Sequence, residues 1–151
     1  MNVTVELAPA RQLAAVRRRI RIPEIRHAWK PALDQVWDFL RTHPGLRTDG
    51  HNIFLYQHPA ARDLPMNIDF GVEVIRSFEP HGEVFPTQTP AGEVATALHV
   101  GPYDQLGEAH DRIHAWAAAN HRTFAGYSWE IYGDPTPDPA QTKTRIVYLL
   151  S

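Results

Sequence analysis

The chain has 151 residues, a formal net charge of −2 at pH 7 and no cysteine. Its length suits one domain with its own core, its charge argues against a general binder of polyanions, and disulfide or thiolate chemistry is excluded. No run approaches the ~20 apolar residues of a membrane helix, and Glu6 and Arg11 stand where a secretory signal needs an apolar core. We therefore expect one cytoplasmic domain over residues 1–151, without contact to a membrane.

A single basic run, Arg17-Arg18-Arg19-Ile20-Arg21, is present in the first half. No helix-turn-helix, zinc-finger or aromatic-plus-basic RNA pattern accompanies these arginines. The favoured interpretation is a solvated strand end, and no direct binding of nucleic acid is expected.

The first half of the chain predicts strands on both sides of one helix. Alternation of apolar and polar residues predicts strands over 3–7, 12–18, 52–57 and 67–75. Apolar residues at helical spacing, which include Trp29 and Trp37, predict a helix from Ile25 to Leu40. Pro31 lies inside this pattern and is expected to kink the helix.

The second half predicts the same sequence of elements. Strands are expected over 83–85, 92–100, 127–132 and 142–150. A helix is expected over 103–120, with a stripe formed by Leu106, Ala109, Ile113, Trp116 and Ala117. Gly101-Pro102 ends the strand that precedes this helix.

An internal repeat relates the two halves. An offset of 76 residues places Ile53–Pro59 on Trp129–Pro135, and the same offset carries Met66–Val74 onto Thr142–Leu150. Neither half, about 1–77 and about 78–151, is long enough to bury much surface alone. We therefore predict an α+β fold of two pseudo-symmetric β-β-α-β-β units, with antiparallel sheets backed by two helices and a ligand cleft between the halves.

Several motifs together resemble the GyrI-like small-molecule-binding family, the fold of effector-binding domains in AraC- and MerR-type bacterial regulators. They are Pro90-Ala91-Gly92, Leu98–Tyr103, Trp129–Pro135, Lys143-Thr144-Arg145 and, in the first half, Asp69–Val74. The resemblance spans essentially the whole chain and implies a small organic ligand. It also implies that Glu130 is the acidic residue facing the ligand cavity. No DNA-binding domain adjoins the motifs, so a stand-alone form is expected.

Alternation in the strand Trp129–Tyr132 places Glu130 and Tyr132 on the same face. The offset of 76 pairs Glu130 with Phe54 and Tyr132 with Tyr56. A cavity between the halves would therefore hold Phe54, Tyr56 and Tyr132 around one carboxylate.

A buried carboxylate without a partner costs several kcal/mol or takes up a proton, with its pKa raised. A cationic or hydrogen-bond-donating ligand would relieve that cost, and we favour this interpretation. The alternative is that tyrosine hydroxyls or Arg145 satisfy Glu130 internally.

Three further residues are candidates for the ligand site, each with a structural alternative. Tyr103 stands at a helix start, Tyr148 on the last strand and His99 in the stretch Leu98–Val100, and each either reaches the cavity or fills the core. Trp37 and Trp116 are expected in the core.

His110 and His114 are spaced i, i+4 on the second predicted helix, and His121 lies on the same flank by helical angle. No carboxylate or cysteine completes a ligand set in the sequence, and the flank is expected to be solvated, so no metal is predicted. A Gly-rich phosphate loop and a serine elbow are also lacking, and no cofactor is expected.

The leading hypothesis is a binder of a hydrophobic or aromatic compound, for which a positive charge is left open and which the protein would sequester as a drug or toxin or sense as a metabolite. The resemblance also implies a second class, hydrolysis of cyclopropane-bearing DNA-alkylating toxins. Glu130 would then orient or deprotonate water, and Tyr132 or Tyr56 would donate a proton. A third class is an interaction protein that modulates gyrase. The partner expected is a small organic ligand, and a homodimer is left open.

Overall fold

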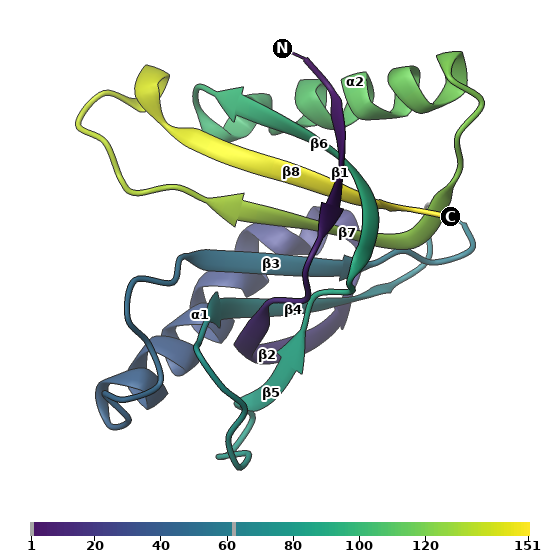
Figure 1. Ribbon diagram of the computed structural model, residues 1–151. Coiled ribbons are helices and arrows are strands. Elements are labelled where there is room, and N and C mark those ends of the chain that lie inside the picture. Colours follow the sequence, from purple (N-terminus) through teal and green to yellow (C-terminus); the bar gives the residue numbers. More distant parts are fainter. Residues whose placement is uncertain (1, 62) are drawn as a thin grey trace.

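The computed structural model describes residues 2–61 and 63–151, which form strands, two α-helices and short 3-10 helices (Figure 1). The strands are β1 (Thr4–Ala8), β2 (Gln12–Ile20), β3 (Asn52–Gln57), β4 (Met66–Glu73), β5 (Phe85–Gln88), β6 (Gly92–Val100), β7 (Phe124–Tyr132) and β8 (Lys143–Leu150). The helices are η1 (Ile22–Glu24), α1 (Ile25–Arg41), η2 (Tyr103–Gln105), α2 (Leu106–Ala119) and η3 (Pro139–Gln141). No helix among these residues is both long and apolar enough to span a membrane.

All eight strands belong to one antiparallel sheet with the order β1-β6-β8-β7-β3-β4-β2-β5. The predicted α+β class is therefore confirmed, and the two halves share a single sheet because β3 pairs with β7 at its centre. Each half also lends its first strand to the other, since β1 pairs with β6 and β5 with β2. This exchange ties the halves together.

The strand pairing follows the offset of the internal repeat. Phe54 pairs with Glu130 at the centre of the sheet, and the flanking pairs Phe54–Phe70 and Glu130–Ile146 differ by the same 76 residues. The strand order also reads the same from either edge when β1–β4 are exchanged with β5–β8. A two-fold rotation that relates the halves in space stays a prediction.

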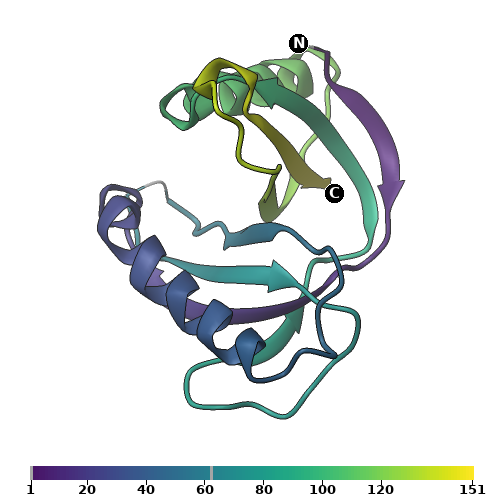
Figure 2. The same ribbon diagram turned by 90° about the vertical axis from the view of Figure 1, so that its left-hand side faces the viewer.

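The two α-helices lie on the same face of the sheet but over different strands (Figure 2). Helix α1 packs against β2 and β4, whereas α2 packs against β6 and β8. On α1 the buried residues are those of the predicted apolar face, namely Ala32, Leu33, Val36, Phe39 and Leu40. The central strands β3 and β7 therefore lie between the helices, which leaves room above them.

The opposite face of the sheet carries its own apolar cluster. Its members are Leu13, Ile53, Leu55, Val94, Trp129 and Val147. Figure 2 shows that the sheet is strongly curved, which brings Leu13 of β2 close enough to Val94 of β6 to share this cluster. Trp129 is 2% exposed, so the aromatic neighbour of Glu130 belongs to this core and not to the helix side.

Several sequence predictions need correction. Strand β5 covers Phe85–Gln88 and not residues 83–85, because its partner β2 offers pairing from Ala15 to Gln12. Strand β7 begins already at Phe124, with an irregular register before Ser128. Trp29 was expected on the buried face of α1, but it is 37% exposed. Helix α1 continues as one α-helix through Pro31, and the kink expected there stays a prediction.

Candidate ligand-binding site

A cleft of about 910 Å³ opens on the helix side of the sheet, above the central strands. It lies between α2 and the start of α1. Its lining residues are Ile22, Ile25, Tyr56, His58, Pro59, Met66, Gly107, His110, Asp111, His114, Phe124, Gly126, Ser128, Glu130 and Tyr148. Such a volume is in the range of small-molecule sites.

Glu130 lies at the floor of this cleft, is 5% exposed and accepts hydrogen bonds on both carboxylate oxygens. The hydroxyls of Tyr56 and Tyr132 donate to Oε1 over 2.5 Å and 2.6 Å. His110 Nε2 donates to Oε2 over 2.7 Å. Strand alternation explains this geometry, because residues 130 and 132 share a face and Tyr56 stands on the neighbouring strand.

The network keeps the carboxyl group of Glu130 ionised. Burial alone raises its pKa, but the hydrogen bond and charge of His110, together with the two tyrosine bonds, outweigh burial and hold the pKa of Glu130 below its ordinary value of 4.5. The sequence argument for a raised pKa is therefore wrong. It assumed an unpaired carboxylate, and the structure gives Glu130 three partners.

The two tyrosines remain hydrogen-bond donors over the physiological range. Burial first, and then the charge of Glu130, raise the pKa of Tyr56 well above its usual value. For Tyr132 burial is again the largest cause, followed by the electrostatic effects of Tyr56 and Glu130. Both phenols thus stay neutral and point their protons at the carboxylate.

His110 is the site residue that the sequence interpretation missed. Its flank of α2 was expected to be solvated, but the ring reaches Glu130 and its Nδ1 lies 2.6 Å from the Tyr148 hydroxyl. A signal existed in the sequence, since Gly107, His110, Asp111 and His114 follow the helical spacing of 3, 1 and 3 residues and all line the cleft. The hydroxyl of Tyr148 is thereby engaged with His110 inside the cleft.

Two more histidines surround Tyr148. His58 stacks on the Tyr148 ring with centroids 5.9 Å apart, and its Nε2 lies 2.6 Å from Ser128 Oγ. His114 meets the same tyrosine edge-on at 5.1 Å. The pKa of His58 is lowered, first by burial and then by the charges of His110 and His114. Imidazole groups therefore line the cleft on two sides.

Phe54 and Tyr103, which were expected at the ligand site, do not line the cleft. Phe54 is 6% exposed and supports the floor through edge contacts with Phe70 at 4.8 Å and Tyr132 at 4.9 Å. Tyr103 is 53% exposed and packs its ring against Tyr132 at 5.6 Å. Both rings therefore contact Tyr132, and Tyr132 in turn donates a hydrogen bond to Glu130.

His99 and Arg145 do not join the site either. His99 is buried on β6, and its Nε2 lies 3.1 Å from the Pro102 carbonyl oxygen, so it supports the turn before η2. Arg145 was a candidate internal partner of Glu130, but it neighbours Ile131 in the sheet register and its guanidinium contacts Thr96 Oγ1 at 3.4 Å. Alternation sends this arginine to the face opposite Glu130.

The three histidines considered above as metal ligands do not all lie at the cleft. His121 does not line the cleft with His110 and His114. Within residues 2–61 and 63–151, no three His, Asp or Glu side chains are arranged to hold a metal ion.

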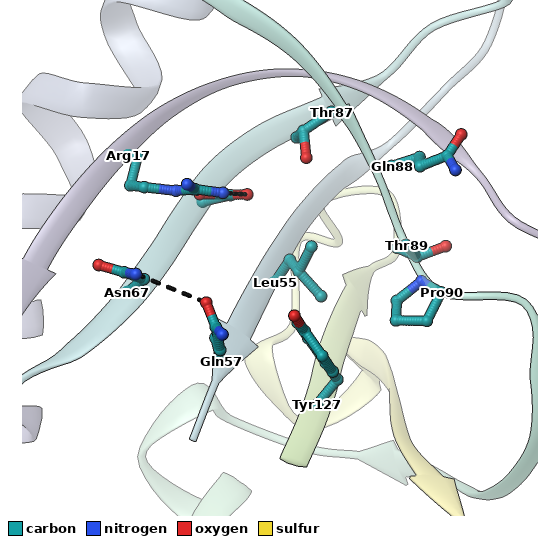
Figure 3. Close-up of a pocket in the computed structure, with 10 residues that line it drawn as sticks. Arg17, Leu55, Gln57, Asn67, Thr87, Gln88, Thr89, Pro90 and Tyr127 are labelled. Carbon is teal, nitrogen blue, oxygen red and sulfur yellow. Dashed lines mark hydrogen bonds and ion pairs between the residues drawn. The ribbon is translucent and has the colours of Figure 1, made fainter. Parts of the chain in front are cut away.

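A second, smaller cavity of about 260 Å³ lies on the opposite face of the sheet (Figure 3). Its lining includes Leu55, Tyr127 and the amides of Gln57 and Asn67, which lie 3.5 Å apart. Asp69 of this cavity is paired with Arg17, so its charge is already neutralised. We therefore take the larger cleft over Glu130 as the candidate site.

Fold and cleft together define an α+β small-molecule-binding domain, with one curved sheet, two helices on one face and a cavity between them. The sequence matches the family described as GyrI-like small molecule binding domain over residues 1–149, and the chain belongs to this family. Among curated proteins no match is found.

Solved structures of low sequence identity share the fold. The EcmrR C-terminal domain is 21% identical with a TM-score of 0.81, covering 99% of this chain and 97% of that one. In the structure of the EcmrR–DNA complex, the match to this protein covers 57% of the EcmrR chain. SAV2435 bound to tetraphenylphosphonium is 9% identical with a TM-score of 0.72, covering 100% and 94%. A hydrolase from Listeria innocua is 13% identical with a TM-score of 0.66, covering 99% and 91%.

Proposed function

We propose that this protein binds a hydrophobic organic cation in the cleft, against Glu130. The observation that carries the proposal is an ionised, buried carboxylate at the floor of a cavity whose lining contains no lysine or arginine among the described residues. The phenol bonds stabilise the negative charge of Glu130 but do not cancel it. His110 neutralises this charge only when it is protonated, so the carboxylate favours a ligand that carries a positive charge of its own.

The remaining walls suit the hydrophobic part of such a ligand. Ile22, Ile25, Met66 and Phe124 supply apolar surface, whose burial stabilises a complex by roughly 25 cal/mol per Å². The rings of Tyr56 and Tyr148 add aromatic faces, and a cation over such a face gains about 0.5–2 kcal/mol. SAV2435, which shares the fold, has been solved with the lipophilic cation tetraphenylphosphonium. This supports the same ligand class here.

Titration calorimetry with tetraphenylphosphonium tests the proposal. We expect Glu130→Gln to weaken the affinity at least about tenfold, which is about 1.4 kcal/mol. Asp69→Asn is the matched control, because Asp69 is a buried carboxylate of the same sheet on the face away from the cleft. No binding by the wild-type protein, or equal losses in both variants, would refute the proposal.

Hydrolysis of cyclopropane-bearing alkylators is a second candidate, favoured by the bonds that join the ionised Glu130 to His110 and two phenols. In this case Glu130 would orient or deprotonate water, and a phenol would donate a proton to the substrate carbonyl. Incubation with such an alkylator, followed by mass spectrometry, separates the candidates. Turnover that Glu130→Gln abolishes would establish the hydrolase, and an unchanged alkylator would leave the binder.

A further inference from the structure

His110 is hydrogen-bonded through both ring nitrogens, to groups of different chemistry. Nε2 lies 2.7 Å from Glu130 Oε2, and Nδ1 lies 2.6 Å from the Tyr148 hydroxyl. An ionised carboxylate only accepts hydrogen bonds, so Nε2 carries a hydrogen in every state that keeps this bond. Any proton that His110 gains or loses is therefore the one on Nδ1.

The Tyr148 hydroxyl allows that proton to come and go. A phenol both donates and accepts hydrogen bonds. When His110 is neutral, the Tyr148 hydroxyl donates to Nδ1, and when His110 is protonated, Nδ1–H donates to the phenol oxygen. Both hydrogen bonds survive in either state, because only the hydroxyl hydrogen turns. The network thus tolerates both charge states of His110 without moving a heavy atom.

Among the described residues that are bonded to Glu130, only His110 can carry a positive charge. A ligand that brings its own positive charge therefore changes which protonation state of His110 is favoured. The other titratable groups facing this pair are Tyr56 from β3, His58 directly after β3, Tyr132 from β7, Tyr148 from β8, and Asp111 and His114 from α2. From η1 and the start of α1 the lining residues are Ile22 and Ile25, which do not titrate. A protonated His110 and a ligand cation therefore compete for the same negative charge.

We propose that His110 determines the charge specificity of the cleft by exchanging its proton for the cation. When an organic cation binds beside Glu130, the Nδ1 proton leaves His110 for the buffer, and the Tyr148 hydroxyl turns to donate to the vacated nitrogen. The cation then balances the Glu130 carboxylate in place of the proton that left. A neutral ligand of similar shape releases no proton. This inference rests on the proposed cation-binding function and adds its coupling to pH.

Calorimetry with tetraphenylphosphonium in two buffers of different ionisation enthalpy, phosphate and ACES at about pH 6.5, counts the protons released. We expect a measurable release of at most about one proton per cation, because Nδ1 of His110 holds a single proton. In His110→Gln the side-chain amide can still donate to Glu130 but does not titrate, and the release should fall to near zero. Neutral triphenylphosphine oxide should release none.

The wild-type protein supplies a second measurement that needs no variant. Its affinity for tetraphenylphosphonium should fall on acidification, by up to about tenfold per pH unit while the released proton is fully bound in the free protein. Cation binding without proton release would overturn the inference and leave the proposed function standing. Release that persists in His110→Gln, or that disappears only in His58→Gln or His114→Gln, would also overturn it. No cation binding at all would refute both.

Discussion

Two buried carboxylates stand on the same sheet, and their partners differ in kind. Asp69 on β4 is 2% exposed and receives two bonds from Arg17, from Nε at 2.7 Å and Nη2 at 3.1 Å. Glu130 on β7 is 5% exposed and is held by two phenols and one imidazole. Asp69 faces the smaller cavity and Glu130 the larger cleft.

The difference lies in whether the negative charge is cancelled. Arginine is permanently charged and matches a carboxylate with two parallel bonds. The hydrogen bond to Asp69 raises the pKa of Arg17 further, so this pair is neutral as a unit at every physiological pH. Phenols leave the charge of Glu130 in place, and an imidazole cancels it only when protonated. A buried carboxylate is thus a candidate site when its partners leave its charge available, and burial alone does not mark one.

The largest effect on stability is expected from neutralising Asp69. Asp69→Asn leaves the Arg17 guanidinium without an ionic partner, and we expect a loss of about 2 kcal/mol in the free energy of unfolding at pH 7. The Arg17 side chain is 48% exposed, and solvation limits the loss to about this size. Glu130→Gln orphans no permanent charge and keeps an oxygen that accepts the phenol bonds, so it should cost less than Asp69→Asn. Urea denaturation of both variants measures this, and a more unstable Glu130→Gln would contradict the comparison.

Removing one phenol from Glu130 should have a smaller effect. Tyr56→Phe or Tyr132→Phe each deletes one hydrogen bond to Oε1, and we expect a loss of about 1 kcal/mol in the free energy of unfolding. Tyr127→Phe is the control, because Tyr127 lies on the opposite face at the smaller cavity. This control should stay within about 0.5 kcal/mol of the wild type. Equal losses in all three variants would show that the bonds to Glu130 are not special.

The smallest effect is expected in acid. The pKa of Glu130 in the folded protein lies below its ordinary value of 4.5, so its contribution to stability is complete above pH 4.5 and is lost as the pH falls further. Below that pH, the wild-type protein should therefore lose stability more steeply than Glu130→Gln. The two proteins share all other carboxyl groups, so the difference between them reports on Glu130 alone. Urea denaturation at a series of acidic pH values tests this. Parallel curves would mean that the folded-state pKa of Glu130 is not lowered.

Period-two alternation and the repeat offset were enough to predict the floor of the site. They placed Glu130 and Tyr132 on one face and related Tyr132 to Tyr56, and the structure joins Glu130 to both tyrosines by hydrogen bonds. This succeeded because the side-chain period of a strand is fixed and the pairing follows the offset of 76 residues. The α+β class followed from the same patterns.

The walls of the site could not be predicted in the same way. Whether His110 faces solvent or Glu130 depends on how α2 is rotated about its axis, and that rotation is set by packing against β6 and β8. His99 and Tyr103 were plausible cavity residues from their neighbours, yet the turn at Pro102 and the exposed end of the helix keep them out.

The sequence by itself determined most of the strands, the two helices and the presence of one acidic residue among large apolar neighbours in the predicted strand 127–132. Only the tertiary structure decided which groups meet that residue and hence its charge. The reason is physical: local patterns depend on neighbours a few residues apart, whereas the pKa of Glu130 depends on His110 and Tyr56, 20 and 74 residues away along the chain.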